Sequence, residues 1–420
     1  MNKKGTIRNT IFKYLVVSIT IINIILIGVS LAIWIGSAQQ NLFIGTDFTN
    51  LFTGFKMVLN GDGAKLYDLA LQAKYQQEIM GDISFESGLL PYLNPPFIAL
   101  IFSPLALLSI SGAFYLWTIG ELGLLIWLIV LINRLFSDWT KKERLVMTLS
   151  ILAFWPLTIT FLFGQFSLLF LTCILQMYIG MGHSKLGRAG LWLVLLAIKP
   201  QILPIPGMMA VNKRYWHVAV TAVISGIVLV IISSAFLGFG TWLNYFQVLP
   251  AMSTNFGKFG FLPDAQFTVR GLLTNILGHS QGGIINIISI VVFVAGVIFV
   301  WLLWRIGIPA DSQRFKLIFA LTILLSAFFS LHLYPHDDLI LVLPTVLFYD
   351  YLRQNNYPRK AYSLVILLTP VIFFITAFSS FNLFGVIRPP VVVILILLVW
   401  MLVYLAKDFR SIRSGISTAI

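Results

Sequence analysis

The residues best suited to chemistry in this 420-residue sequence are polar side chains set inside long apolar runs. Lys199 has long, mostly apolar stretches on both sides. A cation there costs a few kcal/mol near the centre of a bilayer, so lysines in such positions are usually functional. An anionic phosphate would suit Lys199, and Pro200 would break the helix and free backbone groups for binding. The alternatives are snorkelling to the interface and an ion pair with Glu121 or another acid.

An acid, Asp47, follows the first apolar run and precedes a segment with helical periodicity. The apolar positions of that segment are Phe48, Leu51, Phe52, Phe55 and Leu59. This spacing predicts an amphipathic helix that lies along the membrane interface and holds the carboxylate where a lipid head group could reach it. Alternatively, Asp47 simply caps the helix, which is the more common role of an acid at such a position.

Two further groups of polar residues interrupt apolar segments. Gly164 would let backbones approach closely, and the amide of Gln165 can hydrogen-bond a sugar or a phosphate, although a helix-ending glycine beside an incidental glutamine explains the pair equally well. In the second group, His336 and Asp337 could contact a substrate, polarise a hydroxyl, bind a divalent ion or cap the next helix. Because their spacing matches no metal-ligand pattern, substrate contact is the favoured interpretation.

The composition is that of a membrane protein. Hydrophobic residues make up 59% of the chain and charged residues 10%, against roughly 25% charged residues in ordinary globular domains. A soluble fold is therefore excluded. Cys173 is the single cysteine and lies in an apolar run, so neither a disulfide framework nor a multi-cysteine metal site is expected. The net charge of +13 resides in short loops beside apolar segments, which indicates membrane topology rather than nucleic-acid binding.

The apolar segments predict an all-α polytopic membrane protein in which residues 1–420 form a single transmembrane domain. About twelve segments could span a bilayer, several of them short enough to be tilted, broken or re-entrant. They are 14–35, 97–111, 113–133, 145–162, 166–182, 189–210, 218–237, 284–304, 316–332, 339–352, 361–379 and 390–406. Basic residues before the first segment and after the last predict cytoplasmic N- and C-termini.

This topology places two long loops, 36–95 and 238–283, outside the membrane, and loops of such length are usually functional. It also contains a conflict. If 97–111 and 113–133 both cross, the basic segment 134–144 lies outside, against the positive-inside trend. One of the two segments would then only dip into the membrane.

In order and spacing, these motifs resemble glycosyltransferase family 87. This family belongs to the polyprenyl-phosphate-dependent GT-C glycosyltransferases and includes bacterial mannosyltransferases. The resemblance runs from about Asp47 to Pro344. It rests on Asp47-Phe48, Asn60-Gly61, Leu66-Tyr67-Asp68, the stretch from Tyr92 to Pro104, Gly164-Gln165, Lys199-Pro200, Gln266, Gly271-Leu272 and His336. Ser167 stands where the family commonly has Asn, and Asp337 where many members have a second His.

The resemblance implies a GT-C-like helical bundle with amphipathic helices in its first outer loop. It implies inverting transfer of a hexose, mannose being one candidate, from a polyprenyl-phosphate donor to a lipid or glycan hydroxyl on the outer face of the plasma membrane. Asp47 would be the general base. No general acid is needed, because the leaving group is a phosphate. The substrate-binding residues would be Tyr92, Gln165, Lys199, Gln266, Arg270, His336 and Asp337.

Within that set, Lys199 and Arg270 would stabilise the donor phosphate electrostatically, while Gln165 and His336 would orient the substrates. The implied partners are membrane lipids, the lipid-linked sugar and its acceptor, with no nucleic acid. No cofactor is expected besides the donor substrate; no metal ligand is assigned, and a divalent ion remains open. The alternative function is a transporter or flippase of lipid-linked saccharides, which could share the many spans and the buried lysine.

Overall fold

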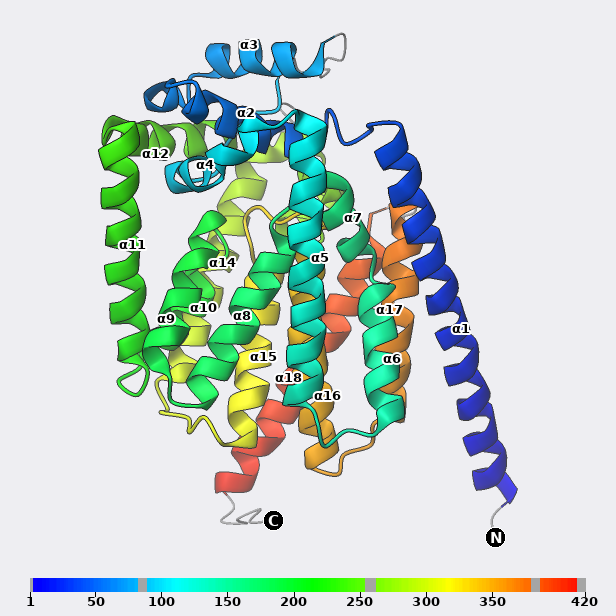
Figure 1. Ribbon diagram of the computed structural model, residues 1–420. Helices are drawn as coiled ribbons and strands as arrows, with labels where there is room; N and C mark the ends of the chain where they lie inside the picture. The colour runs from blue at the N-terminus through cyan, green and yellow to red at the C-terminus, as the bar shows by residue number, and fades with distance from the viewer. Residues whose placement is uncertain (1–2, 82–88, 254–261, 379–385, 414–420) are drawn as a thin grey trace.

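The computed structural model describes residues 3–81, 89–253, 262–378 and 386–413, which fold into helices joined by turns (Figure 1). The first half of the chain contains α1 (Lys3–Gln39), α2 (Asp47–Leu59), α3 (Leu69–Met80), α4 (Pro96–Phe102), α5 (Ile110–Leu135), α6 (Lys141–Leu152), α7 (Trp155–Phe163), α8 (Ser167–Gly182) and α9 (Leu186–Leu195). The second half contains α10 (Pro204–Ala210), α11 (Trp216–Leu237), α12 (Gly240–Ser253), α13 (Val269–Leu277), α14 (Gly282–Trp304), α15 (Gln313–Phe328), α16 (Val342–Gln354), α17 (Lys360–Phe378) and α18 (Pro389–Arg413).

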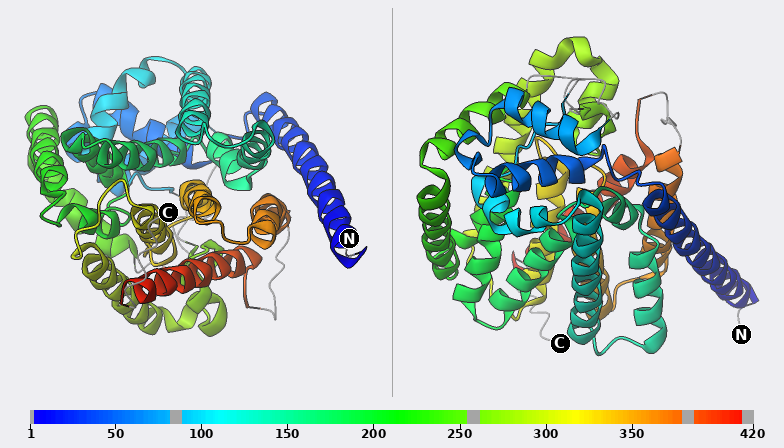
Figure 2. Two further views of the ribbon diagram at one scale, coloured as in Figure 1. Left: turned by 90° about the horizontal axis from the view of Figure 1, so that it is seen from below. Right: turned by 45° about the horizontal axis from the view of Figure 1, so that its top comes forward.

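Short 3-10 helices extend or connect several of these elements. They are η1 (Gly63–Lys65), η2 (Ser103–Leu107), η3 (Leu196–Ile198), η4 (Pro263–Ala265), η5 (His279–Gln281) and η6 (Asp337–Leu341). In this article the upper end of the bundle is the end that carries α2, α3, α4 and α12, and the lower end is the one where α1 begins and α18 ends (Figure 1). Viewed from below, α1 and α11 stand at opposite edges of the bundle (Figure 2).

Five helices in the described ranges are long and apolar enough to cross a membrane, namely α1, α5, α11, α14 and α18. A sixth span results if α6 and α7, bent by 45° at their junction, are counted together. The expected number of about twelve is not confirmed, because several apolar segments form shorter helices, among them α8 and α9. The chain is nevertheless a multi-pass membrane protein, since isoleucines, valines and leucines of α1, α11 and α14 are exposed on the outside of the bundle.

The conflict in the predicted topology is resolved by α4. Pro96 and a short apolar run produce a seven-residue helix continued by η2, and this pair lies at the upper end of the bundle (Figure 1). Only α5 then runs the length of the bundle. As a result, the basic segment 134–144 lies at the lower end, with the start of α1 and the end of α18. Hydropathy alone could not distinguish these two segments, because α4 is apolar for packing against protein: Phe97, Ile98 and Ala99 are buried.

The centre of the bundle consists of α8, α15 and α16. Every residue of α15 from Leu317 to Phe328 is buried, and α8 is buried along most of its length. Such all-round burial is typical of a helix in the core of a large protein. These central helices also end or begin at the turns that carry the polar motifs, which fixes those turns against a rigid interior.

A helix occupies Asp47–Leu59, where the periodicity predicted one. Its apolar residues Phe48, Leu51 and Phe55 are buried, and the helix contacts α3, α4 and η2. The apolar face therefore packs on protein. How α2 lies relative to the membrane surface stays a prediction. The rest of the expected outer loops contains α3 in the first and α12 and α13 in the second, while 82–88 and 254–261 lie outside the described residues.

Candidate functional site

The first half of the site is a contact between the start of α2 and the turn after α7. The amide nitrogen of Gln165 donates a hydrogen bond of 2.6 Å to Oδ2 of Asp47. Asp47 is the first residue of α2, after the N-cap residue Thr46, and no side-chain capping hydrogen bond is present at this terminus. The capping interpretation of Asp47 is therefore wrong. The carboxylate of Asp47 is only partly buried, and it is oriented by the side-chain amide of Gln165 from the turn after α7.

Gly164 explains why these two segments meet. It ends α7 in the left-handed conformation, with φ of +63°, and a Cβ atom built there would lie 2.6 Å from a ring carbon of Phe48. Only glycine satisfies both demands at low cost. The close packing of Gly164 on Phe48 places the next residue, Gln165, beside Asp47.

The second half of the site is a buried ion pair. Nζ of Lys199 lies 2.6 and 2.7 Å from the two carboxylate oxygens of Asp337 and 3.2 Å from Nε2 of His336. Lys199 follows η3 in the break before α10, as Pro200 predicted. Its side chain is 13% exposed and that of Asp337 is fully buried. The partner of Lys199 is therefore Asp337 rather than Glu121.

The pKa values of the two neighbouring acids of η6, Asp337 and Asp338, are shifted in opposite directions. Asp337 also accepts a hydrogen bond of 3.2 Å from the hydroxyl of Ser167. Burial alone would raise its pKa, but His336 and Lys199 together hold the pKa well below the usual range. The carboxyl of Asp338 is buried, and neither of its oxygens has a hydrogen-bond partner among the residues that the structure describes. Burial and then the charge of Asp337 raise the pKa of Asp338.

The turn before η6 is anchored by two other polar residues. Arg270 donates a hydrogen bond of 2.8 Å to the carbonyl oxygen of Leu331 and another to Oδ1 of Asn286. Gln201 donates to the carbonyl oxygen of His332 at 2.9 Å. Burial lowers the pKa of Arg270 to about 10, so it stays charged at neutral pH. Burial, followed by the charge of Lys199, lowers the pKa of His332 to about 3, which keeps this imidazole neutral.

Gln266 lies in an unusually tight turn that brings its backbone against Gly271. A Cβ atom on Gly271 would lie 2.0 Å from the carbonyl oxygen of Gln266, so the chain can fold back only over a glycine. Gln266 is fully buried, and its Oε1 accepts a hydrogen bond of 3.4 Å from Thr268. α13 begins directly after this turn, and Arg270 is the second residue of the helix.

Two residues absent from the predicted site connect its halves. Ser167 bonds to Asp337 and lies two residues after Gln165. Tyr334 accepts a hydrogen bond of 2.8 Å from the backbone nitrogen of Leu262. Burial raises the pKa of Tyr334, and the nearby charge of Asp47 acts in the same direction. Both residues sat within polar motifs visible in the sequence, but serine and tyrosine give no spacing signal of their own.

Tyr92 lies apart from these contacts. Its ring is buried beneath α2, where a Cβ on Gly54 would come within 2.6 Å of it, and its hydroxyl donates a hydrogen bond of 3.2 Å to the carbonyl oxygen of Pro95. Its backbone nitrogen donates to Oε1 of Gln72 at 2.8 Å. Tyr92 therefore supports α2. Apart from Gln266, which bonds to Thr268, the other predicted residues form two groups. Asp47 lies with Gln165, and Lys199 lies with His336, Asp337 and the turn held by Arg270.

Two negative findings bound the site. Within the described ranges, no group of three or more His, Cys, Asp and Glu side chains gathers as a metal ion would require. A cavity lined by residues of α10 and α14 lies at the lower end of the bundle and is not part of this cluster. The polar cluster is therefore identified by its contacts rather than by an open pocket.

Fold and site together define a multi-pass membrane protein with a charged, hydrogen-bonded centre formed where several helices are interrupted. The chain belongs to glycosyltransferase family 87, since residues 92–330, more than half of its length, match the sequence model of that family. The matched range includes Gln165, Lys199 and Arg270 but not Asp47 or His336. It is shorter than the resemblance read from the motifs.

One curated relative from Mycolicibacterium smegmatis (strain ATCC 700084 / mc(2)155) is 27% identical over 244 residues. It is a polyprenol-phosphate-mannose-dependent alpha-(1-2)-phosphatidylinositol pentamannoside mannosyltransferase. The matched segment covers 57% of this chain and 55% of the relative, so the chain spans about half the length of that protein. No solved structure matches the chain.

Proposed function

We propose that this protein transfers a hexose from a polyprenyl-phosphate donor to a hydroxyl of a lipid or glycan acceptor, with inversion at the anomeric carbon. The observation that carries the proposal is the hydrogen bond between Asp47 and Gln165. It joins an acid outside the family match to a residue inside it. This gives a carboxylate that is both oriented and partly accessible, which are the requirements of a general base.

In the proposed reaction, Asp47 takes the proton of the acceptor hydroxyl as its oxygen attacks the anomeric carbon. The new glycosidic bond forms while the bond from that carbon to the phosphate oxygen breaks. The polyprenyl phosphate leaves with the bonding electron pair and needs no proton. Gln165 keeps the carboxylate pointed at the acceptor, because its amide nitrogen is a donor and holds one carboxylate oxygen in place.

The donor phosphate requires nearby positive charge, and the second half of the site supplies it. Lys199 and Arg270 bring two positive charges, and the charged carboxylate of Asp337 offsets one of them. Because Lys199 is already bonded to Asp337, we assign it a stabilising role at longer range. Asp337 then positions Lys199, and His336 lies beside the same ammonium group.

Two further parts of the proposal are the identity of the sugar and the side of the membrane that the site faces. Mannose is the sugar named for the relative, which supports it as a first substrate to test. The turns that join α5 to α6, α8 to α9, α10 to α11 and α14 to α15 all lie at the lower end (Figure 1). These turns and the helix ends beside them contain Arg134, Lys141, Lys142, Lys185, Lys213, Arg214 and Arg305. By the positive-inside trend, the lower end is cytoplasmic and the site faces outward at the plasma membrane.

The direct test is to incubate the purified protein with a lipid extract and one of three donors: polyprenyl-phosphate mannose, polyprenyl-phosphate glucose, or a nucleotide sugar. We expect a new glycolipid from a polyprenyl-phosphate donor and none from the nucleotide sugar. Use of the nucleotide sugar would contradict the donor class. Movement of intact lipid-linked saccharide across proteoliposomes, without a new glycosidic bond, would support a transporter instead.

Sidedness has its own test. In a background with Cys173→Ala, single cysteines would replace Lys65 at the upper end and Lys142 at the lower end, both of which are exposed. An impermeant thiol reagent applied to intact cells should label Lys65→Cys and leave Lys142→Cys unlabelled until the cells are opened. The reverse pattern would place the site in the cytoplasm.

A further inference from the structure

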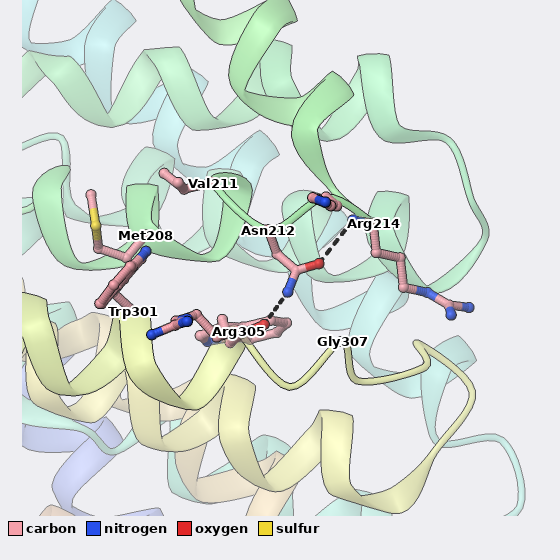
Figure 3. A pocket seen from close by; sticks show the side chains of 9 residues that line it. Met208, Val211, Asn212, Arg214, Trp301, Arg305 and Gly307 are labelled. Atoms are coloured by element: carbon pink, nitrogen blue, oxygen red, sulfur yellow. Dashed lines mark hydrogen bonds between the residues drawn. The ribbon is translucent and has the colours of Figure 1, made fainter.

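A cavity at the lower end of the bundle is separate from the site described above. It has a volume of about 440 Å³ and lies between the end of α10, the turn into α11 and the end of α14 (Figure 3). Its lining includes Asn212, Lys213, Arg214, Trp301, Trp304 and Arg305. A cavity of this size is in the range of small-molecule and head-group sites, roughly 300 to 1,000 Å³.

The lining is strongly and one-sidedly charged. Lys213, Arg214 and Arg305 contribute three cations, and the lining contains no carboxylate. In the described part of the chain, none of the three forms an ion pair with an acid. This contrasts with Arg314, Lys316 and Arg353 at the same end, each of which pairs with an aspartate. The cavity is thus suited to an anion.

The position of the cavity relative to the membrane indicates which kind of anion it would bind. Two of the candidate spans end at the cavity, α11 at Trp216 and α14 at Trp304. Trp301 is 37% exposed, and tryptophans at such positions are typical of the level of the lipid head groups. The guanidinium of Arg305 lies over the ring of Trp301, 4.7 Å from its centroid, which leaves its charge at the interface.

The turn that carries two of the cations is held in place. The side-chain amide of Asn212 donates to the carbonyl oxygen of Trp304 and accepts a hydrogen bond of 2.8 Å from the backbone nitrogen of Arg214. Figure 3 shows Asn212 bridging the two walls, with Arg305 folded toward Trp301 and Arg214 extending from the opposite side. Because Asn212 links the end of α14 to the α10–α11 turn, the backbone segments that carry the cations are held in place relative to each other.

We propose that this cavity binds the phosphate head group of an anionic phospholipid in the leaflet at the lower end. Basic cavities between transmembrane helices on the cytoplasmic side are suited to such head groups. The acyl chains of the lipid would lie along the exposed apolar surfaces of α11 and α14. The proposal is independent of the sugar-transfer function, since it concerns the opposite end of the molecule.

The test measures binding of fluorescent phosphatidylglycerol and of fluorescent phosphatidylcholine to the full chain in detergent. The test variant is Lys213→Gln with Arg305→Gln. The matched control is Lys141→Gln with Lys142→Gln, which removes the same charge from exposed positions at the same end. We expect phosphatidylglycerol to bind the wild type more tightly than phosphatidylcholine, and the test variant to bind it roughly thirtyfold more weakly. The control variant should bind as the wild type does.

Three outcomes would overturn the proposal. Equal binding of the two lipids would mean that the cavity does not select negative charge. Equal losses in the test and control variants would reveal only general attraction to a basic surface. Displacement of phosphatidylglycerol by low concentrations of inorganic phosphate would identify a soluble anion as the ligand. Melting temperatures of the lipid-free variants, expected to be unchanged, show that each variant is folded.

Discussion

Two ion pairs, one at each end of the bundle, are closely matched in geometry and burial. At the upper end, Lys199 lies 2.6 Å from the fully buried Asp337. At the lower end, Lys316 lies 2.5 Å from Asp350, which is 1% exposed. The lysines are 13% and 19% exposed. Ion-pair geometry alone therefore does not distinguish a site from a structural brace.

The surroundings of the two pairs differ. Lys316 and Asp350 lie within the uninterrupted helices α15 and α16, where Trp139 and Gln354 also donate hydrogen bonds to Asp350. Lys199 and Asp337 lie at breaks, and the groups around them are His336, Ser167 and the turn that reaches Tyr334. Interrupted helices expose backbone and polar groups that regular helices keep paired, which is why binding sites in membrane proteins use them.

The largest expected effect separates the two pairs by mutation. Lys199→Met and Lys316→Met each leave a buried carboxylate without its cation, so each should lower the free energy of unfolding by about 3 to 5 kcal/mol. Only Lys199→Met should also weaken donor binding and slow turnover per folded molecule. Thermal melting and donor binding on the same purified samples measure both. If the two variants lost activity to the same extent, the upper pair would be no more than a brace.

A second prediction concerns the upper end alone. Gln165→Glu places a second carboxylate against Asp47, and two like charges at that distance raise the pKa of one of them. The acidic limb of the pH–rate profile should therefore move to higher pH by about one unit or more. Gln165→Ala is the control: loss of the hydrogen bond should lower activity and move the limb by much less than the added carboxylate does. An unchanged profile for Gln165→Glu would mean that Gln165 does not act on the proposed general base, Asp47.

The smallest expected effect concerns Asp338. Its raised pKa means that the folded protein holds the proton more tightly than the unfolded chain does. Asp338 therefore imposes no penalty below its unfolded pKa, near 4, and lowers stability progressively as the pH rises above it. Asp338→Asn removes this dependence with little change of shape.

Melting temperatures of the wild type and of Asp338→Asn should coincide in acid and diverge toward pH 7, with the variant the more stable of the two. Asp337→Asn is the opposite case. Its lowered pKa stabilises the fold above the unfolded pKa and stops doing so as the pH falls through the folded value. Asp337→Asn should therefore be less stable than the wild type at pH 7. A destabilised Asp338→Asn at pH 7 would mean that Asp338 is charged.

The sequence predicted local features better than pairings. The helix after Asp47, the break at Lys199-Pro200 and the turn at Gly164 all followed from residue types and their neighbours. The partner of Lys199 could not be predicted from residue types and their neighbours, because Asp337 is 138 positions away and the nearer intramembrane acid is Glu121. The contact of Asp47 with Gln165, across 118 positions, likewise depends on how α2 packs against α7.

Apolarity also concealed the role of one segment. The segment 97–111 looked like a span, but its residues are apolar because α4 is buried against α2. The hydrophobic pattern records burial without saying whether the neighbour is lipid or protein. The substrate contact of Tyr92 came from the family motif and stays a prediction, while the structure shows that its ring fills the space beneath Gly54.

The central claim is that Asp47 is the general base, and its most direct test is the turnover of Asp47→Asn on a polyprenyl-phosphate sugar. Asn keeps an acceptor oxygen for Gln165 but cannot take a proton, so turnover should fall by at least about a hundredfold while the melting temperature stays the same. Asp62→Asn, an acid at the same end bonded to Tyr75, should keep wild-type turnover. A folded Asp47→Asn protein with wild-type turnover would contradict the account.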